Sequence, residues 1–252
     1  MIRRYDVIGC KISAVNLDRA VDAILRYHSS GDGGYVCFAN VHVTVTAYRS
    51  AEYRALVNGS LLTLADGKPV YWLGRILGNR DIQHIAGPDF LPIILAQKSD
   101  PPLRHYFYGG RPEVLEELIQ SLKRRFPGAL FVGWDSPPFR ELSAGESAEA
   151  IMRIKDSKAD IVWVGLGTPK QDYWMRAHRE ALSPAILMGV GAAFDFHAGC
   201  VKRAPRWMRL IGLEWLYRLM QEPRRLWRRY LVDNTRFVLY VFWDLIFRKQ
   251  VD

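Results

Sequence analysis

The sequence contains little cysteine and no long apolar run. Its three cysteines, Cys10, Cys37 and Cys200, are far apart and show no C-x-x-C spacing. They indicate neither a disulfide framework nor a zinc site, and we expect reduced, buried thiols. The longest apolar stretch near the C-terminus, residues 237–247, includes Asp244 and is well short of the roughly 20 residues that a membrane-spanning helix needs. We therefore expect no membrane span there.

Several catalytic motifs are also missing. The chain has no Walker loop, no G-x-S-x-G elbow and no Asp-x-Asp pair, and its six histidines lack the spacing of metal ligands. This pattern predicts chemistry that needs no metal and no bound cofactor. The first six residues, Met-Ile-Arg-Arg-Tyr-Asp, carry charges where a signal peptide needs an apolar core. A cytoplasmic protein is expected.

Charge is distributed unevenly along the chain. Residues 201–252 hold 12 Lys or Arg against 5 Asp or Glu, whereas residues 1–200 hold 23 against 21. Four of the eight tryptophans also lie in this basic tail. Arginine interleaved with aromatic residues suits an anionic lipid surface, where rings settle at headgroup depth. Nucleic acid is the competing partner, and the apolar content of the tail favours the membrane.

The pattern of apolar runs predicts an α/β fold. Short apolar runs at residues 35–39, 61–65, 105–108, 130–132, 161–165 and 186–190 resemble strands buried on both faces. Amphipathic stretches between them predict helices, most clearly over residues 114–126. We predict a Rossmann-like, mostly parallel sheet flanked by helices in residues 1–200. Residues 201–252 are predicted to form a helical, basic and aromatic appendage.

Polar residues follow two of the predicted strands directly. Asn40 follows the first and Asp66 the second, and parallel strands present such residues to one crevice. A partly buried acid beside glycine is well placed to act as a general base. The alternative is that Asp66 only caps the helix that begins near Pro69.

Three glycine-rich strand exits are candidate ligand-binding loops. Gly109 and Gly110 precede the clearest helix, where backbone N–H groups can hold phosphate. A second loop adds polar side chains at Thr168, Lys170 and Gln171, and a third brings the carboxylate of Asp195. For each loop the alternative is a structural turn or cap without a ligand. The glycine pattern lacks the G-x-G-x-x-G fingerprint, so a nicotinamide cofactor is disfavoured.

Taken together, these motifs resemble one known family, the WecG/TagA/CpsF glycosyltransferases. The resemblance covers roughly residues 5–232. It rests on Asn40, Ala65-Asp66-Gly67, Gly167-Thr168-Pro169-Lys170-Gln171, Gly191-Ala192-Ala193-Phe194-Asp195, Arg203-Ala204-Pro205, Leu213-Glu214-Trp215-Leu216-Tyr217-Arg218-Leu219 and Glu222-Pro223-Arg224-Arg225-Leu226. It implies metal-independent, inverting transfer from a UDP-sugar to a polyprenyl-diphosphate-linked sugar at the cytoplasmic face of the membrane.

The resemblance also implies roles for single residues. Asp66 matches the family's proposed base, and Asn40 and Gln171 match polar active-site positions. The appendage arginines Arg218, Arg225 and Arg228 match residues that complete the active site and bind diphosphate or membrane. A continuous helix would place these three on one side, although Pro223 is expected to start a second helix or kink the first.

One departure from the family pattern bears on the donor. Some members carry Thr where this chain has Phe38. The sequence around Phe38 is closer to exopolysaccharide members, which favours UDP-glucose over UDP-N-acetylmannosamine. Two other functions stay open, a nucleic-acid-binding module and a membrane-bound nucleotide-binding scaffold without catalysis. An oligomer is compatible with the sequence.

Overall fold

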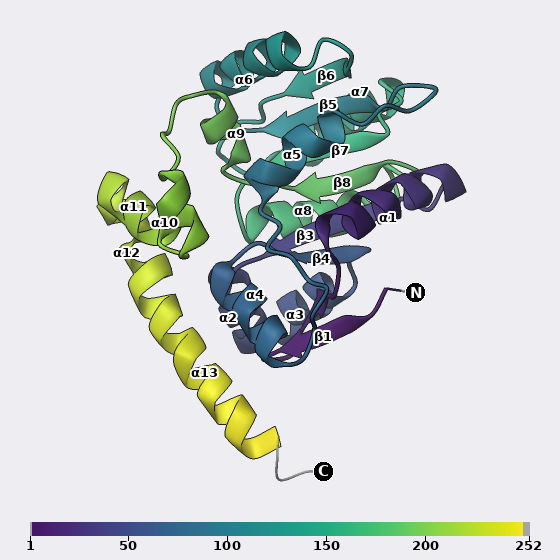
Figure 1. The fold of residues 1–252 in the computed structure, drawn as a ribbon. Helices are drawn as coiled ribbons and strands as arrows, with labels where there is room; N and C mark the ends of the chain where they lie inside the picture. The colour runs from purple at the N-terminus through teal and green to yellow at the C-terminus, as the bar shows by residue number, and fades with distance from the viewer. Residues whose placement is uncertain (1, 249–252) are drawn as a thin grey trace.

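The computed structural model describes residues 2–248 and is built around a parallel sheet (Figure 1). The sheet has the strand order β4-β3-β8-β7-β5-β6. All six predicted strands are confirmed, as β3 (Gly34–Ala39), β4 (Leu62–Ala65), β5 (Arg104–Gly109), β6 (Leu130–Asp135), β7 (Ile161–Gly165) and β8 (Ile186–Gly189). Their continuous apolar runs fit a sheet that is covered on both faces.

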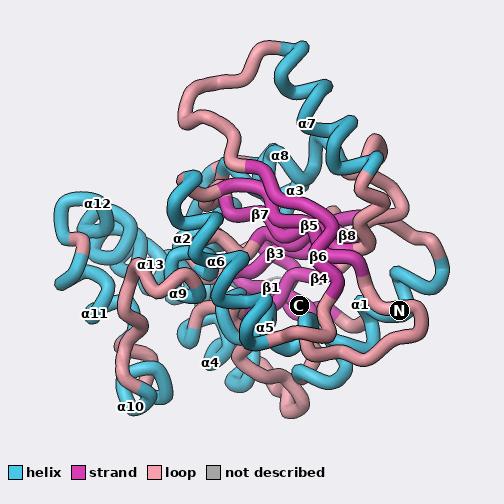
Figure 2. Tube along the Cα trace, turned by 90° about the horizontal axis from the view of Figure 1, so that it is seen from above, coloured by secondary structure: helices cyan, strands magenta, loops and turns pink. Residues whose placement is uncertain are grey.

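Helices cover both faces of the sheet, and Figure 2 shows the sheet enclosed between them. One apolar core includes side chains of α2 (Val41–Arg49), α3 (Ala51–Asn58), α4 (Lys68–Ile76), α7 (Ala144–Asp156) and α8 (Lys170–His178). The other includes α1 (Leu17–Ser30), α5 (Gly87–Leu95), α6 (Pro112–Arg125) and α9 (Ala193–His197). The helix predicted over residues 114–126 is α6.

The strand order creates a crevice at the carboxyl edge of the sheet. From β3 the chain runs outward to β4, crosses to β5 and β6, and returns through β7 to β8 beside β3. The order therefore reverses between β3 and β8, where open α/β sheets bind ligands. Parallel register places Ala39 opposite Ala65, so the residues after β3 and β4 leave the sheet side by side.

A short hairpin at the N-terminus was not predicted. Strands β1 (Arg4–Val7) and β2 (Cys10–Ser13) pair antiparallel outside the main sheet. Each has only 4 residues, and Lys11 interrupts the apolar pattern. The expected burial of thiols is confirmed for Cys10 and Cys37, whereas Cys200 is exposed.

The appendage is helical, as predicted, but it is divided into short pieces. It contains α10 (Arg206–Leu210), α11 (Glu214–Gln221), α12 (Pro223–Trp227), the π-helical turn η1 (Arg228–Val232) and α13 (Asp233–Arg248). Glu222 has non-helical φ and ψ of −131° and 58°, and Pro223 starts a new helix. The expectation that Pro223 starts a second helix is confirmed, so a single helical wheel does not describe the positions of Arg218, Arg225 and Arg228.

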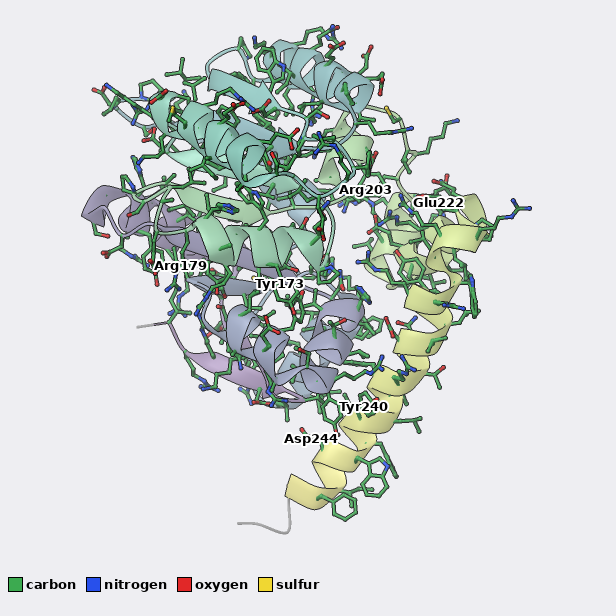
Figure 3. All side chains as sticks on the ribbon, turned by 180° about the vertical axis from the view of Figure 1, so that it is seen from behind. Tyr173, Arg179, Arg203, Glu222, Tyr240 and Asp244 are labelled. Atoms are coloured by element: carbon green, nitrogen blue, oxygen red, sulfur yellow. The ribbon has the colours of Figure 1, made fainter. Side chains whose placement is uncertain are left out.

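The appendage returns to pack against residues 1–200. In Figure 1, α10 to α12 stand beside the carboxyl edge of the sheet, and α13 runs back past α2. Tyr240 of α13 stacks on Tyr48 of α2 with ring centroids 4.1 Å apart. Arg203 and Tyr240 mark the two ends of this junction in Figure 3. Within residues 2–248, no helix is long and apolar enough to span a membrane.

Candidate active site

Two adjoining cavities lie between the carboxyl edge of the sheet and the appendage. The acid cavity is lined by Asp66, His84 and Glu214, with Asn40 and Gln171 in its wall. The arginine cavity is lined by Arg111, Arg225, Arg228 and Arg236, together with Gly110 and Asp195. Seven residues border both cavities, namely His42, Gly167, Thr168, Gly191, Ala192, Arg218 and Arg229.

Asp66 and Asn40 meet at the start of the acid cavity, as their strand positions predict. The amide Nδ2 of Asn40 donates to Asp66 Oδ2 at 3.3 Å, and Asn40 Oδ1 accepts from the backbone N–H of Val43 at 3.2 Å. Asn40 thus caps α2 and holds the carboxylate with the same side chain. The cap of α4 is Gly67, without a side-chain hydrogen bond. The carboxylate of Asp66 therefore does not perform the capping role.

The surroundings of Asp66 suit a general base. Burial raises the pKa of Asp66, while the His84 ring and the Asn40 amide partly offset that rise. His84 Nε2 donates to the backbone carbonyl of Asp66, and burial lowers the pKa of His84. A carboxylate whose pKa is moved upward by burial accepts a proton more readily than a solvated one.

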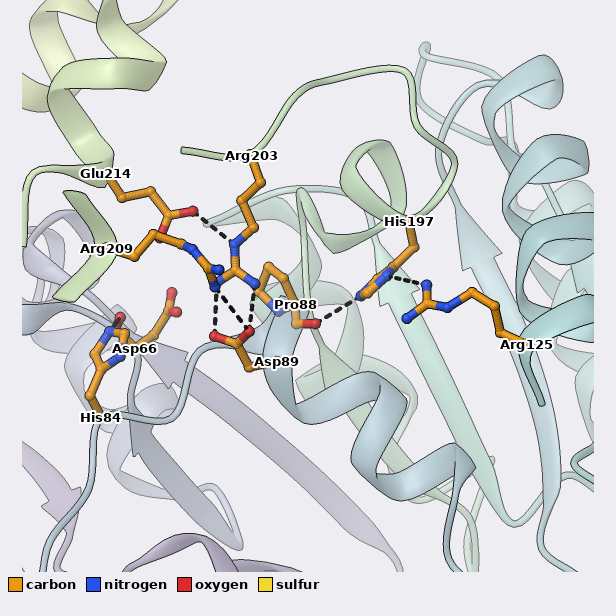
Figure 4. Close-up of polar contacts among 9 residues, drawn as sticks. All are labelled: Asp66, His84, Pro88, Asp89, Arg125, His197, Arg203, Arg209 and Glu214. Atoms are coloured by element: carbon orange, nitrogen blue, oxygen red, sulfur yellow. Dashed lines mark hydrogen bonds and ion pairs between the residues drawn. The ribbon is translucent and has the colours of Figure 1, made fainter. Parts of the chain in front are cut away.

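An arginine joins the appendage to the wall of the acid cavity (Figure 4). The Nη1 and Nη2 atoms of Arg203 donate to the two carboxylate oxygens of Asp89 at 2.5 and 2.8 Å. Its Nε donates to Glu214 Oε1 at 3.0 Å. Arg209 adds a longer ion pair with Asp89 at 3.7 Å. Because Asp89 belongs to α5 and Glu214 to α11, this network fixes the appendage over the site.

The arginine cavity is suited to a polyanion. The three appendage arginines named from the sequence, Arg218, Arg225 and Arg228, line it, and Arg111, Arg229 and Arg236 add to them. Within residues 2–248, four buried side-chain polar atoms have no hydrogen-bond partner, and three of them are Nε atoms, of Arg209, Arg218 and Arg229. All three arginines line the acid cavity. Buried donors without partners are rare in folded proteins, so these three guanidinium groups bring unused donor capacity to the acid cavity.

The other predicted site residues divide into two groups. Thr168 lines both cavities. Gln171 lines the acid cavity but is only 3% exposed. Its side-chain amide stabilises the loop, because Nε2 donates to the carbonyl oxygen of Gly189 at 2.6 Å and Oε1 accepts from the backbone N–H of Gly167 at 3.1 Å. Gly110 and Asp195 border the arginine cavity. Lys170 is exposed and Gly109 is packed against the backbone of Gly165, and neither lines a cavity.

Several lining residues were not predicted as site residues, among them His42, His84, Glu214 and Arg229. Glu214 and Arg229 lie inside the appendage. Because the appendage contains many arginines, the sequence does not show which of its side chains face the cavities. His42 lies in the first turn of α2 and His84 in the loop between α4 and α5, and neither carries a spacing signal. Among residues 2–248, no three His, Cys, Asp or Glu side chains are grouped as metal ligands would be.

Comparison with known proteins gives a consistent assignment. The model of the glycosyl transferase WecG/TagA/CpsF family matches residues 5–251. An N-acetylglucosaminyldiphosphoundecaprenol N-acetyl-beta-D-mannosaminyltransferase of Bacillus spizizenii strain W23 is 31% identical over 205 residues, 81% of this chain and 77% of that protein. A protein of the same name from Bacillus subtilis strain 168 is 27% identical over 217 residues, 86% of this chain and 82% of that protein. The chain therefore belongs to the WecG/TagA/CpsF family of glycosyl transferases.

Proposed function

We propose that this protein is an inverting glycosyltransferase that moves a hexose from a UDP-sugar to a polyprenyl-diphosphate-linked sugar. One observation carries the proposal. A partly buried carboxylate, Asp66, faces a cavity that continues into a second cavity rich in arginine. Transfer from a nucleotide sugar needs a base for the acceptor hydroxyl and cations for the departing diphosphate, and the two cavities supply one each.

The reaction is a single displacement. The acceptor hydroxyl attacks the anomeric carbon of the donor while Asp66 accepts its proton. The bond between that carbon and the diphosphate oxygen breaks, and UDP leaves with both electrons. Arg218 and Arg229 border both cavities, so their guanidinium groups are placed to stabilise the charge that develops on the diphosphate. Guanidinium forks match diphosphate oxygens well, which supports a metal-independent mechanism.

The identity of the substrates rests on two observations. The names of both Bacillus relatives describe transfer to N-acetylglucosaminyldiphosphoundecaprenol, which supports a polyprenyl-diphosphate-linked acceptor here. Those names also describe an N-acetylmannosaminyl donor group. Phe38 lines the acid cavity where some family members carry Thr, and this difference is our reason for choosing UDP-glucose as the donor.

A lipid-linked acceptor requires the protein to work at a membrane surface, and we assign that contact to the appendage. Within residues 2–248, 13 of the 22 exposed large hydrophobic residues lie in the appendage. Phe242 and Trp243 of α13 are 61% and 58% exposed. Exposed aromatic rings beside a net positive charge favour peripheral attachment to anionic lipid. We place the protein on the inner face of the plasma membrane, where UDP-sugars are available.

A screen for UDP release tests the proposal. The full-length protein is incubated with UDP-glucose, UDP-N-acetylmannosamine or UDP-N-acetylglucosamine, with and without a short-chain lipid-diphosphate-sugar acceptor. We expect release that depends on acceptor and is fastest with UDP-glucose. Faster release from UDP-N-acetylmannosamine would reassign the donor. Binding of UDP-sugars without acceptor-dependent release from any of them would overturn the transferase proposal and favour a scaffold.

A further inference from the structure

A histidine and an aspartate from distant parts of the chain form a close pair beside the site. His42 lies in the first turn of α2, and Asp233 is the first residue of α13. His42 Nδ1 and Asp233 Oδ2 are 2.6 Å apart, and Asp233 is 8% exposed. The appendage therefore supplies the carboxylate partner of a catalytic-domain histidine, and this pair forms only when α13 is in place.

The position of His42 connects it to both cavities. It is one of the seven residues that border both the acid cavity and the arginine cavity. Nδ1 of His42 is hydrogen-bonded to Asp233, whereas within residues 2–248 no hydrogen bond involves Nε2 of His42. A histidine that is fixed at one nitrogen and free at the other is available to a ligand through the free nitrogen.

The charges around His42 set its protonation in the free protein. Burial and the Arg229 guanidinium lower the pKa of His42, and Asp233 partly offsets this. Arg236 of α13 also faces the pair, with Nη1 3.6 Å from Asp233 Oδ1. The imidazole is therefore neutral near pH 7 without ligand, with its Nδ1–H donated to Asp233.

We propose that His42 is a diphosphate-binding residue, positioned by Asp233, that takes up a proton when a nucleotide sugar binds at the junction of the two cavities. A diphosphate beside Nε2 would leave the imidazole between two anions, which stabilises the imidazolium form. The proton comes from solvent and returns to solvent when UDP leaves, so no covalent bond to His42 forms. This inference rests on the proposed UDP-sugar donor.

Calorimetry of UDP-glucose binding without acceptor tests the proposal. Titrations in two buffers of different ionisation enthalpy report the protons taken up by the complex. Because binding raises the pKa of His42, we expect proton uptake near pH 7 and an affinity that decreases as pH rises from 6 to 8. UDP-glucose is the suitable probe, since its diphosphate is esterified at both ends and does not titrate in this range.

Three variants separate the roles in this pair. His42→Gln should abolish the proton uptake and weaken UDP-glucose binding about tenfold, the cost of one charge-assisted hydrogen bond. Asp233→Asn keeps the hydrogen-bond acceptor but removes the charge, so it should reduce the proton uptake while His42 stays in place. His28→Gln is the matched control, because His28 pairs with Asp160 at 3.9 Å and lines neither cavity. It should bind as the unchanged protein does.

Docking of α13 needs a separate control. Tyr240→Leu removes the stacking on Tyr48 without touching the pair, so it should keep the proton uptake of the unchanged protein. If His42→Gln takes up protons as the unchanged protein does, the proposal is wrong. Turnover of a UDP-sugar on the lipid-linked acceptor without any proton uptake would overturn this inference alone. Absence of both UDP-sugar binding and turnover would overturn the proposed function as well.

Discussion

At the scale of single residues, the site depends on side chains that perform two tasks at once. Asn40 caps α2 with its oxygen and holds the Asp66 carboxylate with its nitrogen. Arg203 ties α5 to α11 while it lines the acid cavity. Such double use fixes the polar groups of the candidate site on the rigid frame of the sheet, a condition that preorganised catalysis requires.

Replacement of the proposed base gives the most direct test at this scale. Asp66→Asn removes the basic oxygen but changes little volume, so we expect transfer to fall on the order of 10²-fold or more. UDP-glucose affinity and the thermal midpoint should change little. Rates are to be measured at saturating donor and acceptor. Activity within a few-fold of the unchanged protein would exclude Asp66 as the base.

Chelation tests how the diphosphate charge is met. The arginine cavity offers several guanidinium groups to a diphosphate, so we expect full turnover in excess EDTA. The measurement is the initial rate of UDP release before and after dialysis against the chelator. Loss of activity that Mg²⁺ or Mn²⁺ restores would contradict a metal-independent mechanism.

A buried acid away from the cavities predicts how stability depends on pH. Burial raises the pKa of Asp172 to about 7, and Tyr53 Oη donates to its carboxylate at 2.6 Å. In the unfolded chain the pKa of Asp is about 3.9, so between about pH 4 and pH 7 the unfolded state loses a proton that the folded state keeps. The contribution of Asp172 to the free energy of unfolding is therefore complete below about pH 4 and is lost as the pH rises to about 7.

Asp172→Asn should remove this dependence. Relative to the Asn variant, the unchanged protein should lose stability on the order of 3 kcal/mol between pH 4 and pH 7. Urea unfolding of both proteins across this range measures the difference, which cancels the titration of all other groups. A difference that stays constant with pH would show that Asp172 is ionised in the folded protein.

The sequence predicted the site residues at the strand ends better than the site residues of the appendage, which pack over them. Asn40 and Asp66 were found because parallel strands must end at one edge. Arg229 was not, because the side of a helix that faces inward depends on the break at Glu222 and on η1. Lys170 was expected in a ligand-binding loop, but its side chain is exposed and lines neither cavity. Residue type indicated which kinds of side chain to look for, and the path of the backbone determined which of them line the cavities.

At the scale of elements, two contacts hold the appendage against residues 1–200. One is the ion-pair network of Arg203 with Asp89 and Glu214, and the other is the packing of α13 against α2. Arg203→Met keeps the apolar stem but leaves Asp89 and Glu214 without their shared cation. We expect faster amide hydrogen exchange across α10 and α11 and reduced turnover, with a loss of stability of about 1 to 2 kcal/mol because the pairs are only partly buried. Hydrogen exchange with mass spectrometry locates the change.

Arg140 provides the matched control for this substitution. It also pairs with a carboxylate, Glu146, but its side chain is 60% exposed and it lies outside both cavities. Arg140→Met should leave exchange in α10 and α11 and turnover unchanged. Exchange in those helices that is as slow in Arg203→Met as in the unchanged protein would show that the network does not hold the appendage.

At the scale of the whole molecule, the charge-balanced residues 1–200 carry a basic appendage at the edge of the sheet where the two cavities lie. The sequence indicated this division through its charge and tryptophan content, and the predicted α/β fold is confirmed. The packing of α13 against α2 was not predictable, because the Tyr48–Tyr240 stacking joins residues far apart in sequence. The two parts meet around the acid cavity, so our proposal assigns membrane contact and completion of the active site to the same segment.

Separating these two tasks is the final test. Phe242→Ser with Trp243→Ser removes exposed aromatic area from α13 while leaving Asp233 and Tyr240 in place. We expect release from anionic vesicles, because reversible attachment depends on buried aromatic area as well as charge. Turnover on a water-soluble acceptor analogue should stay unchanged. Met152→Ser, also at an exposed apolar residue (62%) but in α7, should change neither quantity.

Truncation after residue 200 should differ from this double variant in one respect. It removes Glu214, Arg218 and Arg229 from the cavity walls, so turnover on the soluble acceptor should fall together with vesicle binding. Sedimentation with anionic vesicles and initial rates on the soluble acceptor give the two readouts. Full soluble-acceptor activity in the truncated protein would reduce the appendage to an anchor. Vesicle binding that survives the Phe242 and Trp243 changes would place the lipid contact elsewhere on the molecule.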